Sequence, residues 1–435
     1  MHAYLQMRLA KLEEITIIKI NKLNIKSLKN GKLMFVAVFA KVKSILGKKL
    51  SLGLMVLAMF SVGATNTIAQ SIDTPAKYAI LLDAETGTVL YEKDADLPFP
   101  PASMSKLMTT YVAFEMIKNG VFTLEDTTIV STDVWRRWRG QGSTMFLNAN
   151  DEVTIEQLLK GIIIQSGNDA CVVLAEAMAG SEEAYVQWMN AKAVDLGLKN
   201  SNFVNTNGWP QEGQEMSARD LAILAQHIVN DFPELYKMYS ERSYTYGIDS
   251  GSGQNITQRN RNPILGRVEG GDGLKTGHTE QSGYSLTASA ERDGRRLVMV
   301  VSGLESERAR SREGQRLLEY GFRNFKTYHL FTKGQVIDVA EVWLGAEARV
   351  PLVVETPVTL TMSRFDRSRM TATLVYDSPI PAPIKAGQAV AHIRISIPEK
   401  DDLIVPLLAG NDVENLGGFG KISAAFAHML FGTSQ

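Results

Sequence analysis

The sequence predicts a mixed α/β domain over residues 75–328, a small all-β domain, expected to be a sandwich, over residues 334–408, and an amphipathic helix over residues 411–432. Three observations indicate this order: a strand hairpin precedes a helix-rich middle, strands return late in the first domain, and short alternating runs separated by Pro and Gly follow residue 334. With 435 residues, 45% hydrophobic and 21% charged, the composition excludes a disordered chain, and a single Cys excludes a disulfide scaffold.

A basic leader is expected over residues 1–69. This segment holds eleven of the 46 Lys and Arg residues but only two of the 47 acids, so the formal net charge of -1 divides into a basic leader and an acidic remainder of net -10. Two lysines precede the apolar run 50–62 and small residues follow it, which is the order of a secretory signal peptide. The run is short for a spanning helix of about 20 residues, so we expect export and cleavage after residue 64 or 69. Because a signal usually has about 15–30 residues, we expect the physiological start near Met34.

The α/β domain opens with a hairpin followed by a helix. Residues 78–83 and 89–91 are apolar strands around the turn 84–87. Apolar residues then recur at helical spacing up to Gly120, so a helix is expected to begin at Ser103. Further helices are expected at 155–164, 168–178, 182–196, 217–229 and 310–322, and strands at 283–290 and 297–303.

Ser103 and Lys106 form the only S-x-x-K sequence in the chain. Residues i and i+3 share a helix face, so a neutral Lys106 amine is able to accept the proton of the Ser103 hydroxyl. A serine at the start of a helix also has a main-chain N–H without an intrahelical partner, which is available to an oxyanion. Alone the motif is a weak signal, because chance produces about one or two in such a chain.

Two further motifs fall on other elements. Ser166 and Asn168 form the only S-x-N sequence, between two expected helices, where by itself it resembles a capping turn. Lys275, Thr276 and Gly277 form a K-T-G sequence that leads into a strand. Here the lysine offers a positive charge, the threonine a hydroxyl, and the glycine room for an extended substrate along the strand edge.

The three motifs stand in one order, 63 and 109 residues apart, which is the signature of serine penicillin-recognising enzymes. Over residues 75–431 the chain resembles the low-molecular-mass penicillin-binding proteins, the exported D-alanyl-D-alanine carboxypeptidases. The resemblance rests on the segments 101–106, 165–171 and 272–279, the small β domain and the amphipathic tail. It implies a transpeptidase/β-lactamase-like α+β domain, with an antiparallel sheet and a helical subdomain.

The resemblance also implies the partners. The substrate is the D-Ala-D-Ala end of the peptidoglycan stem peptide, and β-lactam antibiotics are covalent inhibitors. The implied location is the periplasm, with peripheral attachment to the inner membrane through the helix at 411–432, whose phenylalanines suit an interfacial position although its basic content is thin.

The implied mechanism is acyl transfer. Ser103, deprotonated by Lys106, attacks the penultimate D-Ala carbonyl, the main-chain N–H groups of Ser103 and His278 hold the oxyanion, and Ser166 relays the proton to the leaving D-Ala before water hydrolyses the ester. The charge of Lys275 is expected to lower the pKa of Lys106. The implied catalytic residues are Ser103, Lys106 and Ser166, and the implied substrate-binding residues are Asn168, Lys275, Thr276, Gly277 and His278.

Four alternatives are weighed against this function. A Ser-His-Asp hydrolase is disfavoured because this chain contains no G-x-S-x-G sequence. A class A β-lactamase would need S-D-N, where this chain has Gly167, and a deacylating carboxylate, for which Glu182 and Glu183 are the candidates. A D,D-endopeptidase differs only in the chain that leaves. An inactive wall-binding module would not need the intact motifs.

The remaining features predict no additional chemistry. No metal-ligand spacing or phosphate loop occurs, so no cofactor and no metal are expected. On an acidic exported chain, the patch at 135–139 favours a partly packed surface loop, or a rim contact with glycan, over a nucleic-acid site. Cys171 is expected to be a small core residue that gives the site some thiol sensitivity. Arg308 and Arg312 are expected at the surface, with carboxylate binding as the alternative.

Overall fold

The computed structural model describes residues 2–5, 72–248 and 251–417. The chain divides into two compact units. The first contains Ile72–Tyr328 together with Leu360–Met362, and the second contains His329–Thr359 and the described residues from Ser363 onward, with residues 2–5.

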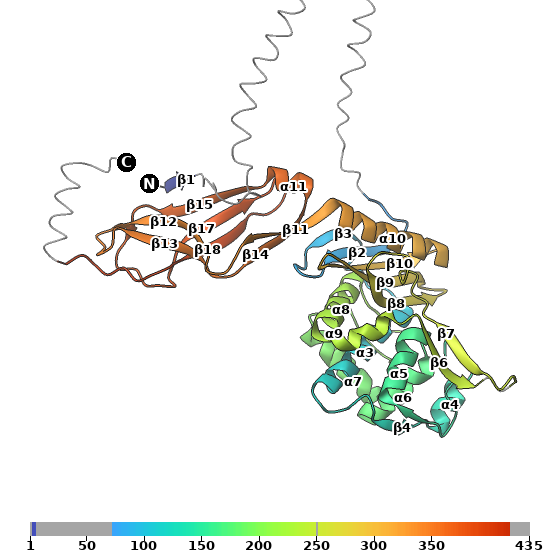
Figure 1. The fold of residues 1–435 in the computed structure, drawn as a ribbon. Coiled ribbons are helices and arrows are strands. Elements are labelled where there is room, and N and C mark those ends of the chain that lie inside the picture. The colour runs from blue at the N-terminus through green and yellow to red at the C-terminus, as the bar shows by residue number, and fades with distance from the viewer. Residues whose placement is uncertain (1, 6–71, 249–250, 418–435) are drawn as a thin grey trace, which may run out of the picture. The chain divides into compact units, whose positions relative to one another are not determined.

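A five-stranded antiparallel sheet organises the first unit (Figure 1). Its strands are β2 (Tyr78–Asp83), β3 (Val89–Lys93), β8 (Gly271–Thr279), β9 (Gly283–Arg292) and β10 (Arg295–Leu304). The spatial order is β3-β2-β10-β9-β8, which leaves β8 at one edge. The first hairpin and the late return of strands are confirmed. The K-T-G sequence, expected just ahead of a strand, lies inside β8.

The two faces of this sheet bury separate cores, because side chains alternate along each strand. On β10, Leu297, Met299 and Val301 pack with α10 (Glu307–Asn324), whereas Val298 and Val300 pack with the other helices. Gly321 of α10 has no room for a Cβ, which would lie 2.6 Å from the Leu297 side chain. The sheet is therefore held between α10 and a helical subdomain.

The helical subdomain begins with a short 3-10 turn, η1 (Ala102–Ser105), and the first helix, α3 (Lys106–Lys118). The elements that follow are α4 (Thr132–Trp138), α5 (Ile155–Lys160), the π-helical turn η2 (Gly161–Gln165), α6 (Asn168–Ala179), α7 (Glu182–Asp195), α8 (Ala218–Asp231), α9 (Pro233–Tyr236) and the 3-10 turn η3 (Lys237–Ser240). The helices expected from periodicity are therefore present. Serine side chains cap several of them, as Ser181 caps α7 and Ser217 caps α8.

One expectation in this subdomain is wrong. The patch at 135–139, expected as a partly packed surface loop, is partly packed but lies largely in the helix α4. Ser131 accepts the N–H of Val134 at the start of this helix, and Val134 and Trp138 are buried while the arginines stay outside. Seven residues are too few for a periodic signal, so the capping serine was the only local indication of a helix.

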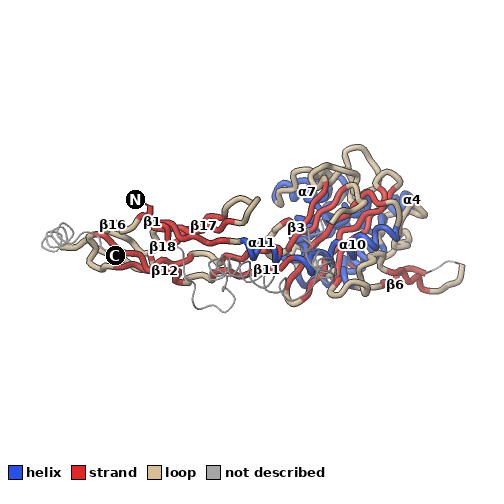
Figure 2. The backbone as a smooth tube through the Cα atoms, turned by 90° about the horizontal axis from the view of Figure 1, so that it is seen from above, coloured by secondary structure: helices blue, strands red, loops and turns tan. Residues whose placement is uncertain are grey.

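Two small antiparallel pairs complete the unit. They are β4 (Thr127–Ile129) with β5 (Glu152–Thr154), and β6 (Ser243–Ile248) with β7 (Asn255–Arg259). In Figure 2 the β6 hairpin extends away from the helical part. Neither pair was expected from the sequence, because strands this short and exposed carry little alternation.

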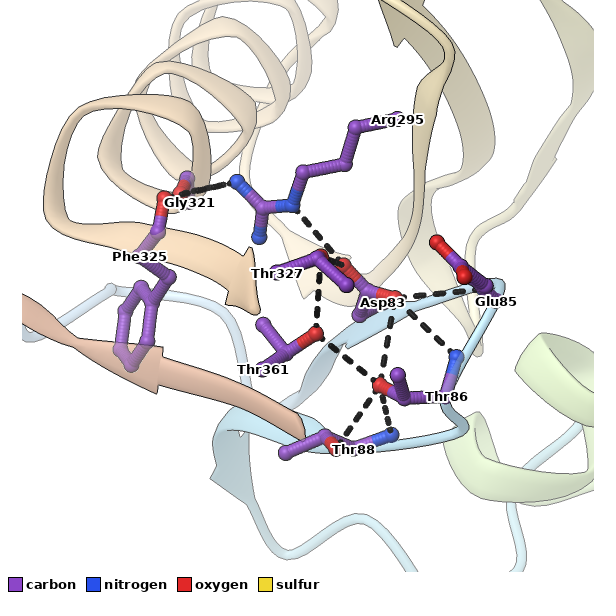
Figure 3. Close-up of polar contacts among 9 residues, drawn as sticks. All are labelled: Asp83, Glu85, Thr86, Thr88, Arg295, Gly321, Phe325, Thr327 and Thr361. Carbon is purple, nitrogen blue, oxygen red and sulfur yellow. Dashed lines mark hydrogen bonds and ion pairs between the residues drawn. The ribbon is translucent and has the colours of Figure 1, made fainter. Parts of the chain in front are cut away.

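Asp83, at the end of β2, is fully buried and organises the first turn (Figure 3). Its carboxylate accepts hydrogen bonds from the main-chain N–H groups of Glu85 and Thr86. It also forms an ion pair with Arg295, whose Nε lies 2.9 Å from the carboxylate oxygen. Thr327 donates to the same carboxylate. A buried carboxylate needs this number of donors to offset the loss of hydration.

The second unit is all-β apart from the short helix α11 (Arg364–Arg369). The strands of its main sheet are β1 (His2–Leu5), β12 (Val336–Trp343), β13 (Arg349–Val354), β15 (Thr371–Asp377), β16 (Ile380–Pro381), β17 (Ala389–Ser396) and β18 (Leu403–Ala409). Their order in the sheet is β1-β15-β17-β18-β13-β12-β16. A separate pair consists of β11 (Phe325–Phe331) and β14 (Val358–Ser363), and the residues of each strand are divided between the two units. The expected small β domain is confirmed. Except for β1, the expected leader lies outside the described residues.

The tail expected as a helix over 411–432 begins as extended backbone in its described part. Val413 is buried and exchanges main-chain hydrogen bonds with Ile384, while Glu414 accepts the N–H of Ala346. Residues 411–417 therefore add extended backbone to the β domain, because these partners occupy the groups that a helix would use. The rest of the expected helix lies outside the described residues.

Candidate active site

The start of the helical subdomain brings Ser103 and Lys106 together. Ser103 lies in η1, one turn before α3, and not in the α-helix that the sequence predicts to begin there. The tighter 3-10 turn aligns residues i and i+3 on one side. Lys106 Nζ lies 3.0 Å from Ser103 Oγ, and the lysine side chain is almost completely buried.

Lys106 has two further partners, each an oxygen that can only accept a hydrogen bond. Its Nζ atom lies 2.8 Å from Oδ1 of Asn168 and 2.6 Å from the main-chain oxygen of Asn207. A neutral amine has two N–H groups, which match these two oxygens, and one lone pair, which is left for the Ser103 hydroxyl. The environment thus orients the amine as a base toward the serine.

Burial makes the neutral form accessible. The pKa of Lys106 is lowered to about 8. The main cause is desolvation, and the positive charge of Arg261 lowers the pKa further. We expected Lys275 to be the lowering charge, but burial and Arg261 account for the direction. The pKa of Lys275 is itself well below its ordinary value because of burial and the charges of Lys106 and Arg261.

The S-x-N sequence joins η2 to α6 directly beside Lys106. Ser166 has a left-handed backbone, with φ of 64°, which few non-glycine residues adopt, and its hydroxyl accepts a hydrogen bond from Lys275 Nζ at 3.0 Å. Asp169, three residues after Ser166, is buried and accepts hydrogen bonds from the main-chain N–H groups of Met145 and Leu147. Three motifs that are distant in sequence therefore meet at one point.

On β8, Gly277 has a structural role in addition to the substrate-binding role expected from the sequence. A Cβ atom on this residue would lie 2.8 Å from the main-chain oxygen of Pro101 and 3.2 Å from Met104. The glycine therefore lets the segment that carries Ser103 approach the strand, and is not simply an opening for substrate. The exposed His278 ring lies against Tyr284, with 3.9 Å between ring centroids.

Two arginines near the site were missed in the sequence. Arg261 donates to Ser143 Oγ at 2.6 Å, and its charge acts on both lysines. Arg310 is buried, its Nε has no hydrogen-bond partner, and its charge also lowers the pKa of Lys275. Arg308 and Arg312, which the sequence singled out, flank it at the surface. Only burial distinguishes Arg310 from its neighbours on an arginine-rich helix.

Of the two candidate deacylating carboxylates, Glu183 is exposed and Glu182 is already hydrogen-bonded within the protein. The Oε1 atom of Glu182 accepts the N–H and the hydroxyl of Thr206 at 3.1 and 2.9 Å, and its Oε2 pairs with Arg137. Thr206 precedes Asn207, whose oxygen holds Lys106. Glu182 therefore positions the loop behind the base. This connection was invisible in the sequence because it joins α7 to an irregular loop.

Two other side chains complete the description. Cys171 is fully buried, its Sγ donates to the main-chain oxygen of Gly167, and desolvation raises its pKa to about 12, so the expected thiol sensitivity is not supported. Over the described residues no group of three His, Cys, Asp or Glu side chains could hold a metal ion.

Family models match most of the chain. One described as D-alanyl-D-alanine carboxypeptidase matches residues 64–306, and one described as Penicillin-binding protein 5, C-terminal domain, matches residues 325–415. D-alanyl-D-alanine carboxypeptidase DacC of Escherichia coli is 36% identical over 376 residues, which cover 85% of this chain and 92% of the relative. DacF of Bacillus subtilis is 33% identical over 350 residues, covering 79% and 87%.

Solved structures agree with these matches. The crystal structure of penicillin binding protein 5 from Haemophilus influenzae is 34% identical with a TM-score of 0.69, covering 79% of this chain and 99% of that one. Penicillin binding protein 6B from Escherichia coli is 33% identical with a TM-score of 0.65, covering 78% and 96%. The similarity therefore includes both units.

Proposed function

The chain belongs to the D-alanyl-D-alanine carboxypeptidase family and functions as a serine-type hydrolase of that kind, and from this premise we propose how its own residues perform the reaction. The substrate is a peptidoglycan stem peptide that ends in D-Ala-D-Ala. The reaction breaks the amide bond between the two D-Ala residues, forms an ester with the enzyme, and releases the terminal D-Ala. Water then hydrolyses the ester.

The contacts of Lys106 carry this proposal. Ser103 is the nucleophile and Lys106 its base, because the lysine directs its two N–H groups to Asn168 and Asn207 and its lone pair to Ser103 Oγ, 3.0 Å away. A pKa of about 8 leaves a useful fraction of neutral amine near neutral pH. In the same proposal Ser166, held by Lys275, passes the proton on to the leaving amine.

The order of residues along β8 gives the direction of the substrate. We assign the terminal carboxylate to the hydroxyl of Thr276 and the oxyanion to the main-chain N–H groups of Ser103 and His278. Successive strand residues advance by about 3.3 Å, so the acyl part of the substrate continues toward Thr279. A cleft of about 480 Å³ that includes Thr279, Pro101 and Trp209 lies at that end and accommodates the upstream stem peptide.

The leaving side lies in the opposite direction, toward Arg261 and Arg310. Both contribute positive charge around Lys275. A guanidinium is suited to a carboxylate because it presents parallel N–H groups. These two arginines, with Thr276, form the proposed carboxylate subsite, while Asn168 and Lys275 orient the peptide.

Replacement of Ser103 by Ala tests this assignment. We expect the Ser103→Ala variant to lose both D-Ala release from a stem pentapeptide and covalent labelling by a fluorescent penicillin. Labelling that persists in this variant would place the nucleophile elsewhere. A β-lactamase is disfavoured because Glu182 is engaged with Thr206, and turnover of benzylpenicillin compared with D-Ala release measures that alternative directly.

We further propose that the chain is exported, that residues 1–69 are its leader, that residues 75–328 and 334–408 are its domain limits, and that the tail over 411–432 attaches it to the inner membrane. Among the described residues no helix is long and apolar enough to cross a membrane. Truncation after residue 417, which keeps the strand-like segment of the β domain, tests the tail. Unchanged membrane association of the truncated protein would contradict the attachment.

A further inference from the structure

The main sheet of the second unit carries apolar side chains on both of its faces. One face builds the core of the β domain, where Leu352 and Leu407 are fully buried. Because side chains alternate along a strand, the residues between them point to the opposite face, and residues paired across two strands share a face. In an antiparallel sheet with one solvated face, that second face is normally polar.

On this sheet the second face has two adjoining apolar rows across β12, β13 and β18, which lie side by side (Figure 1). Val336 pairs with Val353, which pairs in turn with Leu408, and Val339 pairs with Pro351 in the next row. We call these five residues the outer apolar face. Val336 and Val339 are 54% and 46% exposed, and the other three are partly exposed. A continuous exposed apolar surface of this kind marks a place where another group docks.

The charges at the two ends of the outer apolar face are balanced. Glu341 lies across from Arg349 at one end. At the other end Arg394 pairs with Asp402, with 3.7 Å between Nε and Oδ2. A surface that binds an anionic membrane directly is rich in Lys and Arg around its apolar part. The balanced charges therefore favour an apolar protein segment over lipid headgroups as the occupant.

The chain itself supplies such a segment. The main-chain N–H of Leu416 donates to the oxygen of Leu344, just after β12, so the tail leaves the β domain at the end of the strand that carries two residues of the outer apolar face. Beyond residue 417 the tail sequence has apolar residues three or four positions apart, which is the spacing of a helix with one apolar side. These residues are Phe419, Ile422, Phe426 and Leu430.

The length of the tail matches the distance it has to cover. Measured along β12 at 3.3 Å per residue, Val339 and Val336 lie about 17 and 26 Å from Leu344. A helix over 418–431 measures about 21 Å at 1.5 Å per residue, so its second half reaches both rows. A tethered segment is also present at an effective concentration in the millimolar range, which a separate partner seldom reaches.

We propose that residues 418–431 form a helix whose apolar side packs on the outer apolar face when no membrane is present. The membrane attachment proposed above uses the same apolar side, so the two partners exclude each other. The β domain thereby covers the tail in solution and releases it to a lipid surface. This inference is independent of the reaction at Ser103, and the docked state does not require that the tail bind a membrane.

Trypsin cleavage of the full chain in lipid-free solution tests the docking. Lys421 is the only Lys or Arg after residue 400, and the rate of cleavage there, followed by mass, measures the fraction of undocked tail. The Val336→Gln/Val339→Gln double variant weakens the apolar contact, so we expect about tenfold faster cleavage at Lys421. Val121→Gln is the matched control, because Val121 is a 60% exposed valine of the first unit, and it should keep the wild-type rate. An unchanged rate in the double variant overturns the proposal.

A variant of the tail guards against misfolding of the double variant. Phe426→Gln leaves all described residues intact and should also speed cleavage at Lys421 about tenfold. An unchanged rate in this variant would equally refute the docking. An unfolded β domain would be cut at many sites between residues 329 and 417, so cleavage confined to Lys421 reports the tail alone.

Binding to phosphatidylcholine vesicles distinguishes the possible occupants. Because docking competes with lipid, the double variant should bind vesicles about tenfold more tightly than the wild-type chain, whereas Phe426→Gln should bind more weakly. Weaker binding by the double variant would show that the outer apolar face itself contacts lipid, and would overturn the proposal. So would a wild-type dimer in sedimentation that the double variant loses, since the occupant would then be a second copy. Unchanged vesicle binding by Phe426→Gln would contradict only the membrane attachment, because the trypsin rates decide the docking separately.

Discussion

The Nζ atom of Lys106 lies 2.6 Å from the main-chain oxygen of Asn207, 101 residues later in the chain. A main-chain oxygen cannot donate, so this contact always takes an N–H from the lysine. Asn168 Oδ1 takes another at 2.8 Å. When the amine is neutral, only its lone pair remains for Ser103. The direction of proton transfer is therefore set jointly by Asn168 of the S-x-N motif and by Asn207, which lies in an irregular loop outside the three motifs.

The pH dependence of acylation follows from this arrangement. Only the neutral lysine accepts a proton, and its pKa of about 8 lies below the ordinary value because the side chain is buried. We expect kcat/KM for D-Ala release to rise with pH to a plateau, with an apparent midpoint of about 8 that belongs to the coupled lysines. The Arg261→Gln variant removes a neighbouring positive charge, so its midpoint should move to higher pH. A midpoint that stays in place or falls in this variant would contradict the assignment of the charge.

Glu182 is expected to act through the loop behind the base. The Glu182→Ala variant removes the acceptor of both Thr206 hydrogen bonds, and we expect kcat/KM to fall about tenfold or more because the loop that carries Asn207 is released. The Glu182→Gln variant retains an acceptor oxygen and should recover most of the activity. A general base would not be replaced by an amide, so equal losses in the two variants would point to chemistry at Glu182.

Gly208 is expected to be essential for the geometry around Ser103. Its φ is +75°, and a Cβ at this position would collide with the main-chain oxygen of Ala102. The Gly208→Ala variant should lower the free energy of unfolding by about 2–4 kcal/mol, from strain and overpacking together, and reduce kcat by about 10²-fold. Gly120→Ala is the matched control, because its φ is +72° but nothing lies within 4 Å of the added Cβ. It should cost about 1–2 kcal/mol and leave kcat unchanged. Equal changes in the free energy of unfolding and in kcat for the two variants would show that the protein relieves the collision between the new Cβ and Ala102.

The buried ion pair between Asp83 and Arg295 predicts a stability change without a change in chemistry. In the Asp83→Asn variant, Arg295 keeps its main-chain acceptors Gly321 and Phe325 but loses its counter-charge, so the free energy of unfolding should fall by about 3–5 kcal/mol. Denaturant unfolding measures this loss, and penicillin labelling at low temperature should be unaffected. The Thr327→Val variant removes only one neutral donor to the carboxylate and should cost about 1 kcal/mol. A loss of comparable size in both variants would argue against the ion pair as the main contribution.

The sequence predicts much of this molecule because its signals are local. The helix 182–196 and the strands 283–290 and 297–303 follow from periodicity and turn residues, and the order of motifs indicates which side chains meet. Contacts made by irregular segments could not be predicted, since neither Asn207 nor Arg261 lies in a periodic pattern. The helix expected over 411–432 is an error of another kind, because here a sequence signal is present but fits two structures. Its apolar spacing also fits an extended segment, and pairing of Val413 with Ile384 decides the outcome for the described part.

Cys171 provides a final check on how dry the centre of the helical subdomain is. The thiol is fully buried on α6, near Lys106, and desolvation raises its pKa to about 12. Only the thiolate reacts with alkylating reagents, so at pH 8 ionisation alone makes Cys171 react roughly 10³-fold more slowly than an ordinary thiol. We expect iodoacetamide to leave the native protein unmodified and active, and to modify one thiol after unfolding. Rapid alkylation of the native protein, with loss of penicillin labelling, would show that water reaches this helix and that the pKa of the neighbouring Lys106 is closer to its ordinary value than burial predicts.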